Sequence, residues 1–125
     1  MSLAPILFLN FTMKRSDLNS YIKNARRIVV KVGSARVSGD EKSMNDFLFS
    51  LVGDIRQLFD DKKEVILVSS GAVAQGKKIM SDYSGKTFDK KTIIERQALA
   101  AIGQSRLMSL YESFFSRVNV PISQI

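Results

Sequence analysis

Apolar residues along the chain follow two patterns with different periods. Two short runs, IVVKV at 28–32 and EVILVSS at 64–70, are nearly continuous in Ile, Leu and Val. Such runs are typical of strands that are buried on both faces of a parallel sheet. From Ser43 to Phe59 the apolar residues instead recur every three or four positions, which predicts an amphipathic helix of about four turns. Ser43 and Asp46 resemble a capping box at its start.

The order of these elements constrains the fold. The segment GAVAQGKKIM at 71–80 has a helical pattern and follows the second run, so the chain reads strand, helix, strand, helix. This order requires two parallel strands joined by a right-handed crossover. A longer helix is expected over 92–117, with Gly103 at a bend or a close approach. The segment VPISQI at 120–125 indicates a third strand, entered through Pro121.

The predicted fold class is α/β, with an open parallel sheet and helices on both faces. Since no helix follows the third strand within this sequence, we expect an incomplete, doubly wound sheet. The chain divides into an N-terminal extension or arm, 1–25, and a domain, 26–125. The first residues, MSL, fit a vector-derived remnant, with Met13 as an alternative start. Polar residues predict loops at 34–42 and 81–91.

Composition limits the chemistry that is available. The 125 residues, 45% of them apolar, fit one globular domain. The sequence has no Cys and no His, which excludes disulfides, Cys/His zinc sites, thiol nucleophiles and catalytic triads that use imidazole. No metal site is predicted. Any catalysis therefore depends on Lys, Arg, Ser, Thr, Asp, Glu and backbone amides.

Charge and hydropathy indicate the kinds of partner. The net charge is +7, and basic residues are concentrated within 14–31, which suggests an anionic partner. Aromatic residues do not alternate with these bases as in a stacking platform, so a solvated face or arm is favoured over nucleic-acid binding. The apolar run from Ala4 to Leu9 is too short to cross a bilayer and lacks the flanking features of a signal peptide. We therefore expect a cytoplasmic protein without nucleic-acid or membrane partners.

The stretch SSGAVAQGKK at 69–78 is close to a phosphate-binding P-loop. Gly71, Gly76 and Lys77 have the spacing of G-x-x-x-x-G-K. The pattern then requires Ser or Thr, whose hydroxyl ligates Mg²⁺, but Lys78 stands at that position. The residues between the two glycines also favour helix over a wide glycine-rich loop. We therefore expect no P-loop here.

Both predicted strands end in a turn of small residues, KVGS at 31–34 and SSGA at 69–72. Ligands of open parallel sheets bind outside the carboxyl ends of the strands, so we expect the two turns to be neighbours in a binding site. Lys31 is a candidate because a lysine in an apolar strand is costly to bury unless its ammonium reaches an anion. The alternative is a lysine that extends into solvent. Ser70 and Gly71 fit a binding turn and equally fit a plain strand-to-helix turn, with serine as the helix cap.

Four segments, in this order along the chain, together form a pattern that is specific enough to indicate a family: VVKVGS, ILVSSGAVAQG, RQALAAIGQSRLMSLYESFF and VPISQI. They resemble the N-terminal half of the glutamate 5-kinases, which are members of the amino acid kinase family. The resemblance covers the chain from about Arg26 to Ile125. It implies a three-layer α/β/α domain, of which 26–125 would be the N-terminal, substrate-binding part.

The resemblance implies an activity. This activity is ATP-dependent phosphorylation of the side-chain carboxylate of L-glutamate to glutamyl 5-phosphate, the first step of proline biosynthesis, with Mg²⁺ accompanying ATP. A carboxylate is already ionised, so such a reaction needs neither a general base nor histidine. The resemblance further implies a homo-oligomer and feedback inhibition by proline.

The resemblance also implies roles for individual residues. Lys31 would be the catalytic residue and would contact the ATP phosphates, beside the amides of Gly33 and Ser34. The turn that would bind glutamate consists of Ser70, Gly71 and Ala72.

The residues that complete both substrate sites in this family lie beyond the last residue of this sequence, and the turn GSARVSGDEK departs from the family's usual GTSVLT style. We therefore expect the chain to provide the glutamate-binding half and to be inactive as a kinase by itself. The alternative is a truncated, catalytically inactive α/β module for binding or interaction.

Overall fold

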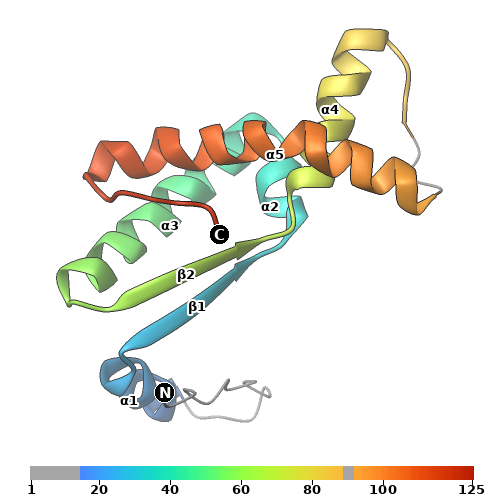
Figure 1. Cartoon of the computed structure of the whole chain (residues 1–125). Coiled ribbons are helices and arrows are strands. Elements are labelled where there is room, and N and C mark those ends of the chain that lie inside the picture. The colour runs from blue at the N-terminus through green and yellow to red at the C-terminus, as the bar shows by residue number, and fades with distance from the viewer. Residues whose placement is uncertain (1–14, 89–91) are drawn as a thin grey trace.

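The fold is α/β, built on one pair of parallel strands (Figure 1). The computed structural model describes residues 15–88 and 92–125. Strands β1 and β2 pair in parallel, from Arg27 opposite Glu64 to Val32 opposite Ser69. This confirms the predicted α/β class and the parallel pairing. The elements in chain order are α1 (Arg15–Asn24), β1 (Arg27–Val32), α2 (Ser34–Ser38), α3 (Glu41–Asp60), β2 (Glu64–Ser69), α4 (Ala72–Ser84), α5 (Ile93–Phe115) and the 3₁₀ turn η1 (Ser116–Val118).

The core lies between one face of the sheet and the helices α3 and α5, which Figure 1 shows on the same side of the strands. Residues of β1 alternate between exposed and half-buried positions and end at the buried Val32, so the expected burial on both faces is wrong for the described part of the chain. Val29 is 56% exposed and Val68 is 44% exposed, because α3 and α5 contact the opposite face. The buried core consists of Val32, Val37, Leu48, Val52, Ile55, Leu107, Tyr111, Phe114, Phe115 and Val120.

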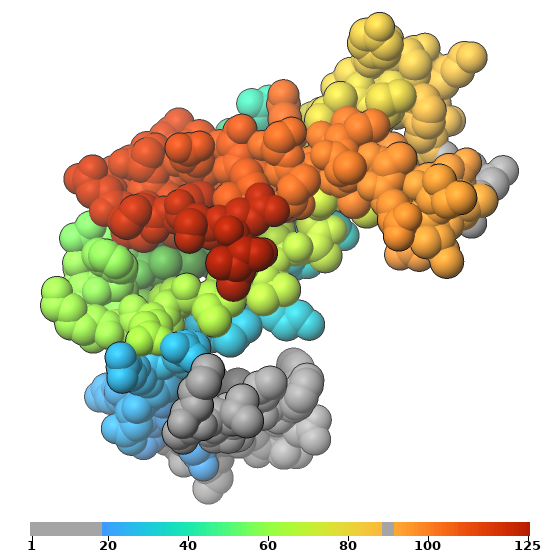
Figure 2. Space-filling view, viewed as in Figure 1, coloured from blue at the N-terminus to red at the C-terminus, as the bar shows by residue number. Residues whose placement is uncertain are grey.

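Helices α4 and α5 touch through their backbones at two glycines. A Cβ placed on Gly76 would lie 1.9 Å from the carbonyl oxygen of Leu99. A Cβ on Gly103 would lie 1.9 Å from the carbonyl oxygen of Ala72. Neither position can hold a side chain without moving backbone, which confirms the predicted close approach at Gly103. Figure 2 shows α4 and the start of α5 extending away from the remaining described elements.

Residues 34–42 were expected to be a loop, but they contain α2 and the start of α3. The helix α2 forms because the side chain of Val37 is fully buried and the hydroxyl of Ser38 donates to the carbonyl of Ser34 at 2.7 Å. Helix α3 begins before the predicted Ser43, since the N-cap is Asp40. Its carboxylate accepts a hydrogen bond from the Ser43 amide at 2.9 Å, so the predicted capping box is wrong.

One further boundary differs from the prediction. The predicted loop 81–91 begins later, because α4 continues to Ser84 and ends at Gly85, which adopts a left-handed φ of 66°. Residues 89–91 of that loop lie outside the described residues.

The predicted third strand, 120–125, has no strand structure. Asn119 has a left-handed φ of 54° and Val120 is buried, so the chain turns back beneath α5 (Figure 1). Pro121 cannot donate a backbone hydrogen bond, and neither β1 nor β2 pairs with this segment.

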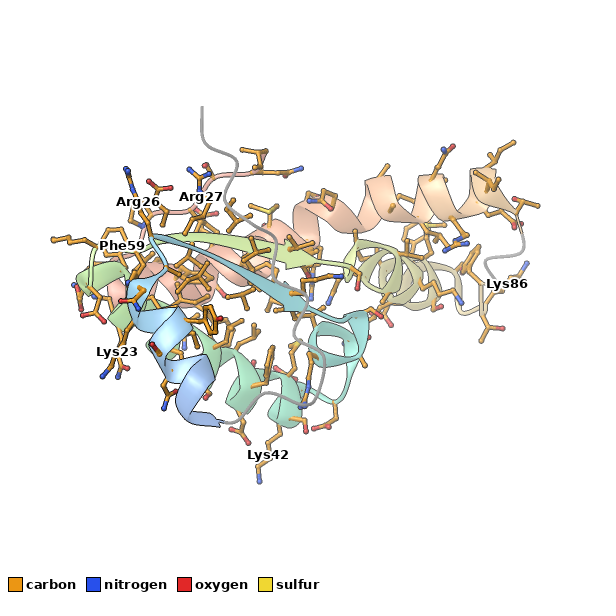
Figure 3. All side chains as sticks on the ribbon, turned by 90° about the horizontal axis from the view of Figure 1, so that it is seen from below. Lys23, Arg26, Arg27, Lys42, Phe59 and Lys86 are labelled. Atoms are coloured by element: carbon orange, nitrogen blue, oxygen red, sulfur yellow. The ribbon has the colours of Figure 1, made fainter. Side chains whose placement is uncertain are left out.

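Basic residues gather at the end of the sheet where both strands begin. Figure 3 shows Lys23, Arg26 and Arg27 there, with Lys86 at the far end of the molecule. Arg26 and Arg27 form ion pairs with Glu64 at 3.1 and 2.6 Å, and the hydrogen bond and charge of Arg27, followed by those of Arg26, lower the pKa of that carboxyl. The side chain of Arg26 is 86% exposed, so this surface is solvated. In residues 15–88 and 92–125 no helix is long and apolar enough to cross a membrane.

The substitution Gly103→Ala tests the backbone contact between α4 and α5. We expect it to lower the free energy of unfolding by about 2 kcal/mol or more, since overpacking costs about 1–3 kcal/mol even where side chains can move. Urea denaturation followed by circular dichroism measures this change. Gly53→Ala in α3 is the matched control, because a Cβ there meets nothing within 4 Å. The free energy of unfolding of the control should rise by about 0.5–1 kcal/mol, because alanine has the higher helix propensity. Equal effects of the two substitutions would contradict the close packing at Gly103.

Candidate functional site

The two turns of small residues lie side by side at the carboxyl end of the sheet. Lys31 is paired with Val68 across the strands, and Val32 is paired with Ser69. The pairing extends one step further, since the amide of Ser70 donates to the carbonyl of Val32 at 3.2 Å. The turns are therefore neighbours, as the sequence predicted.

Lys31 lies on the exposed face of the sheet. The cost of burying a lysine therefore does not apply to it, and its exposure matches the alternative of a lysine that extends into solvent. Lys31 remains a candidate because of its position, one residue before the end of β1 and next to β2. Side chains alternate along a strand, so Val68 and Ser70 lie on the same side of the sheet as Lys31, and all three are exposed.

The turn after β1 is open around its glycine. Gly33 is exposed, has an extended backbone with φ of −71°, and a Cβ placed on it meets nothing within 4 Å. The fold therefore does not require glycine at this position, and the space beside it is free for a ligand. Ser34 is half-buried and begins α2.

The turn after β2 is closely packed. A Cβ on Gly71 would lie 2.3 Å from Cγ2 of Val37 and 3.2 Å from Cδ1 of Leu107, so glycine is required here by the contact with α2 and α5. Gly71 is the N-cap of α4 and no side chain caps this helix, so Ser70 does not act as a cap. The first N–H groups of α4, from Ala72 onward, have no intrahelical acceptor and can bind an anion.

Hydrogen bonds on the core side of the sheet support this turn. The hydroxyl of Tyr111 in α5 lies 2.9 Å from Oγ of Ser69, the last residue of β2. Burial raises the pKa of Tyr111, which keeps its hydroxyl neutral. The side-chain amide of Gln75 in α4 donates to the carbonyl of Val37 in α2.

The P-loop reading of residues 69–78 does not match the structure. Residues from Ala72 onward are helical, and Gly76 is buried inside α4 against α5. A P-loop needs a wide, glycine-rich loop whose amides surround phosphates, and this segment has none. The expectation that no P-loop occurs here is confirmed.

Sequence comparison identifies the family. Residues 26–125 match the model of the amino acid kinase family. The chain belongs to the amino acid kinase family. The resemblance to glutamate 5-kinases is also confirmed, since a glutamate 5-kinase from Geobacter metallireducens is 42% identical over 105 residues, which are 83% of this chain and 27% of the relative.

Two further relatives agree. A glutamate 5-kinase from Desulfotalea psychrophila is 46% identical over 101 residues, which are 81% of this chain and 26% of the relative. One from Dictyoglomus thermophilum is 42% identical over 101 residues, which are 80% of this chain and 26% of the relative. The chain thus spans about 27% of the length of the curated relatives that it matches.

Two residues of this amino acid kinase chain that support the turns were missed by the sequence reasoning. Gln75 and Tyr111 are buried, and each connects segments that are distant in sequence. A signal for Gln75 exists in the sequence: it stands four residues after Gly71 and next to Gly76, on the helix face that the two glycines bury. Nothing comparable marks Tyr111, since tyrosine is common in buried helix faces.

The described part of the chain contains no group of three or more Asp, Glu, His or Cys residues that could hold a metal ion. The groups of the two turns that could contact a ligand are the ammonium of Lys31, the hydroxyls of Ser34 and Ser70, and backbone amides. All of these favour anions.

Substituting the two turn glycines should give opposite results. Gly71→Ala forces its Cβ into Val37, and we expect a loss of about 1–3 kcal/mol in the free energy of unfolding. Gly33→Ala should leave this free energy within about 0.5 kcal/mol of the original, because the added carbon meets nothing. Thermal and urea unfolding measure the free energy of unfolding of both variants. A strong destabilisation by Gly33→Ala would show that the first turn is packed rather than open.

Proposed function

We propose that this chain provides the glutamate-binding part of an enzyme that transfers the γ-phosphoryl group of ATP to the side-chain carboxylate of L-glutamate. The observation that carries the proposal is that the turns at 31–34 and 69–72 lie side by side, at one end of the sheet. The names of the relatives, glutamate 5-kinase in each case, support the same reaction. Residues 26–125 would be the substrate-binding part of the kinase domain, and 1–25 an extension.

In this proposal the second turn binds glutamate. The amides at the start of α4 would donate to a carboxylate, and the positive end of the helix dipole would favour its charge. The exposed hydroxyl of Ser70 would add a donor, and Gly71 and Ala72 would complete the turn. The buried contacts behind Gly71 hold this turn in place before any ligand binds.

The first turn would contact the phosphates of ATP. The ammonium of Lys31 would reduce the negative charge on the transferring group, which is the main requirement of phosphoryl transfer. The amides of Gly33 and Ser34 would donate beside it, and the open space at Gly33 would let a phosphate approach the backbone. ATP supplies the phosphoryl group when bound, and Mg²⁺ as its companion is part of the proposal.

The chemistry fits the available residues. The acceptor is a carboxylate with an ordinary pKa of about 4.3, so it is ionised at neutral pH and needs no base. The remaining tasks are alignment of the two substrates and neutralisation of charge, which lysine and backbone amides can perform. Inhibition by proline would follow if proline competed with glutamate for the turn at 70–72. A cytoplasmic location stays a prediction.

Calorimetric titration of the purified chain with L-glutamate tests the proposal. We expect saturable binding that Ser70→Ala weakens by about tenfold, because a hydrogen bond to a charged ligand is lost. Ser50→Ala is the matched control, since Ser50 is also exposed but lies in α3. A folded chain that does not bind glutamate, or that binds it equally well after Ser70→Ala, would contradict the assignment and favour a binding or interaction module of another kind.

A homo-oligomer is also proposed, and an apolar stripe on α5 supports it. Ile94 is 78% exposed and Ile102 is 38% exposed. Together with small residues they follow helical spacing on one exposed face: Ile94, Ala98, Ala101, Ile102 and Ser105. A second copy of the chain could cover this face by packing helix against helix.

Light scattering coupled to gel filtration measures the oligomeric state. We expect a mass of at least twice that of one chain, and a shift toward the monomer when Ile94→Glu and Ile102→Glu are combined, since the charges cannot be buried unpaired. The combined Lys77→Glu and Lys78→Glu variant is a control for the added charge on α4. A monomer at all concentrations would contradict the proposal.

A further inference from the structure

Apart from Tyr111, whose ring carries a hydroxyl, Gln75 is the one buried polar side chain among the residues that the structure describes. It lies at the end of the first turn of α4 and is 6% exposed. Its Nε2 donates to the carbonyl oxygen of Val37, which is 38 residues earlier in the chain and belongs to α2. A glutamine is costly to bury unless its amide is paired, so this hydrogen bond is a required feature of its position.

The helix α2 needs this partner. It has five residues, and helices of this length are unstable by themselves. Its last carbonyls lack intrahelical donors. Gln75 donates to the carbonyl of Val37, which is one of these, and the hydroxyl of Ser38 adds a hydrogen bond to the carbonyl of Ser34, the first residue of α2. Two side chains thus donate to carbonyls of α2, and one of them comes from α4.

Val37 contacts the second turn and the start of α4 in two ways. Its carbonyl accepts from Gln75, and its fully buried side chain occupies the place where a Cβ on Gly71 would be. The side-chain contact is apolar and non-directional, so it fixes distance but not orientation. The hydrogen bond is directional, and it restricts how α2 is turned relative to α4.

We propose that Gln75 is a positioning residue, whose amide holds α2, and with it the turn at Gly33 and Ser34, in a fixed orientation to the turn at 70–72. That these turns bind two substrates rests on the function proposed above, whereas the contact itself does not. Group transfer depends steeply on the alignment of donor and acceptor. Gln75 would therefore govern how the two turns are aligned and would have little effect on glutamate affinity.

Hydrogen exchange measured by NMR on the labelled chain tests the contact. In the unmodified chain the side-chain amide protons of Gln75 should exchange at least about tenfold more slowly than those of exposed Gln57, because they are buried and paired. Gln75→Leu keeps the size but removes the donor. We expect the backbone amides of 36–38 to exchange about tenfold faster in this variant, while α3 and α5 keep their protection. Gln57→Leu is the matched control, and it should change neither the exchange of the amides of 36–38 nor the protection of α3 and α5.

A general loss of stability would speed exchange throughout the core, so the local change distinguishes positioning from a merely structural role. Should Gln75→Leu fail to fold, Gln75→Met provides a second variant, and the side-chain amide of the unmodified chain gives an answer without any variant. Fast exchange of the Gln75 side-chain amide, or unchanged protection of α2 in a folded variant, overturns the proposal.

Titration with L-glutamate separates this proposal from the proposed function. We expect Gln75→Leu to bind glutamate within about twofold of the unmodified chain, because the turn at 70–72 keeps its own contacts. A large loss of glutamate affinity would place Gln75 in the glutamate turn itself and would overturn its role in alignment. Failure of the unmodified chain to bind glutamate would count against the proposed function, and the exchange rates would still decide the contact.

Discussion

The candidate site depends on the backbone contact between α4 and α5. Gly103 faces the carbonyl of Ala72, the first residue of α4, so α5 holds the start of α4 without any side chain between them. The same helix carries Tyr111, whose hydroxyl contacts Ser69 at the end of β2. Helix α5 therefore fixes both sides of the turn that joins β2 to α4. Any side chain at Gly76 or Gly103 would separate the helices and displace this turn.

A second set of contacts joins the two turns to each other. Parallel pairing continues from Val32 to the amide of Ser70, so the strand ends are in register. Val37 then brings α2 against Gly71, and Gln75 completes the connection. These contacts lie on the core side of the sheet, whereas Lys31 and Ser70 are exposed on the other face. The buried side thus provides rigidity, and the exposed side is free for ligands.

The elements that sequence reasoning predicted well are those whose own residues determine them. Leu48, Val52 and Ile55 repeat with the helical period and are buried, as the pattern for α3 required. The two apolar runs became paired strands, and the order of elements made them parallel. The motifs around Lys31 and Ser70 also led to the correct family.

The features that were missed depend on contacts between distant residues. The helix α2 is too short to have a period, and it is stabilised by burial of Val37 and by Gln75 from another helix. Burial of a strand on both faces depends on what packs against each face, which the composition of β1 cannot reveal. A strand also needs a partner strand, and 120–125 pairs with neither β1 nor β2, so its apolar character was insufficient.

The central claim is that the turns at 31–34 and 69–72 form one anion-binding site. The most direct test is a map of backbone amide chemical shifts in the labelled chain as L-glutamate is added. The account predicts that the largest changes occur at 70–72, with smaller changes at Gly33 and Ser34 and none at the basic end of the sheet near Arg26. Changes centred on that basic end, or spread evenly over the charged surface, would contradict it.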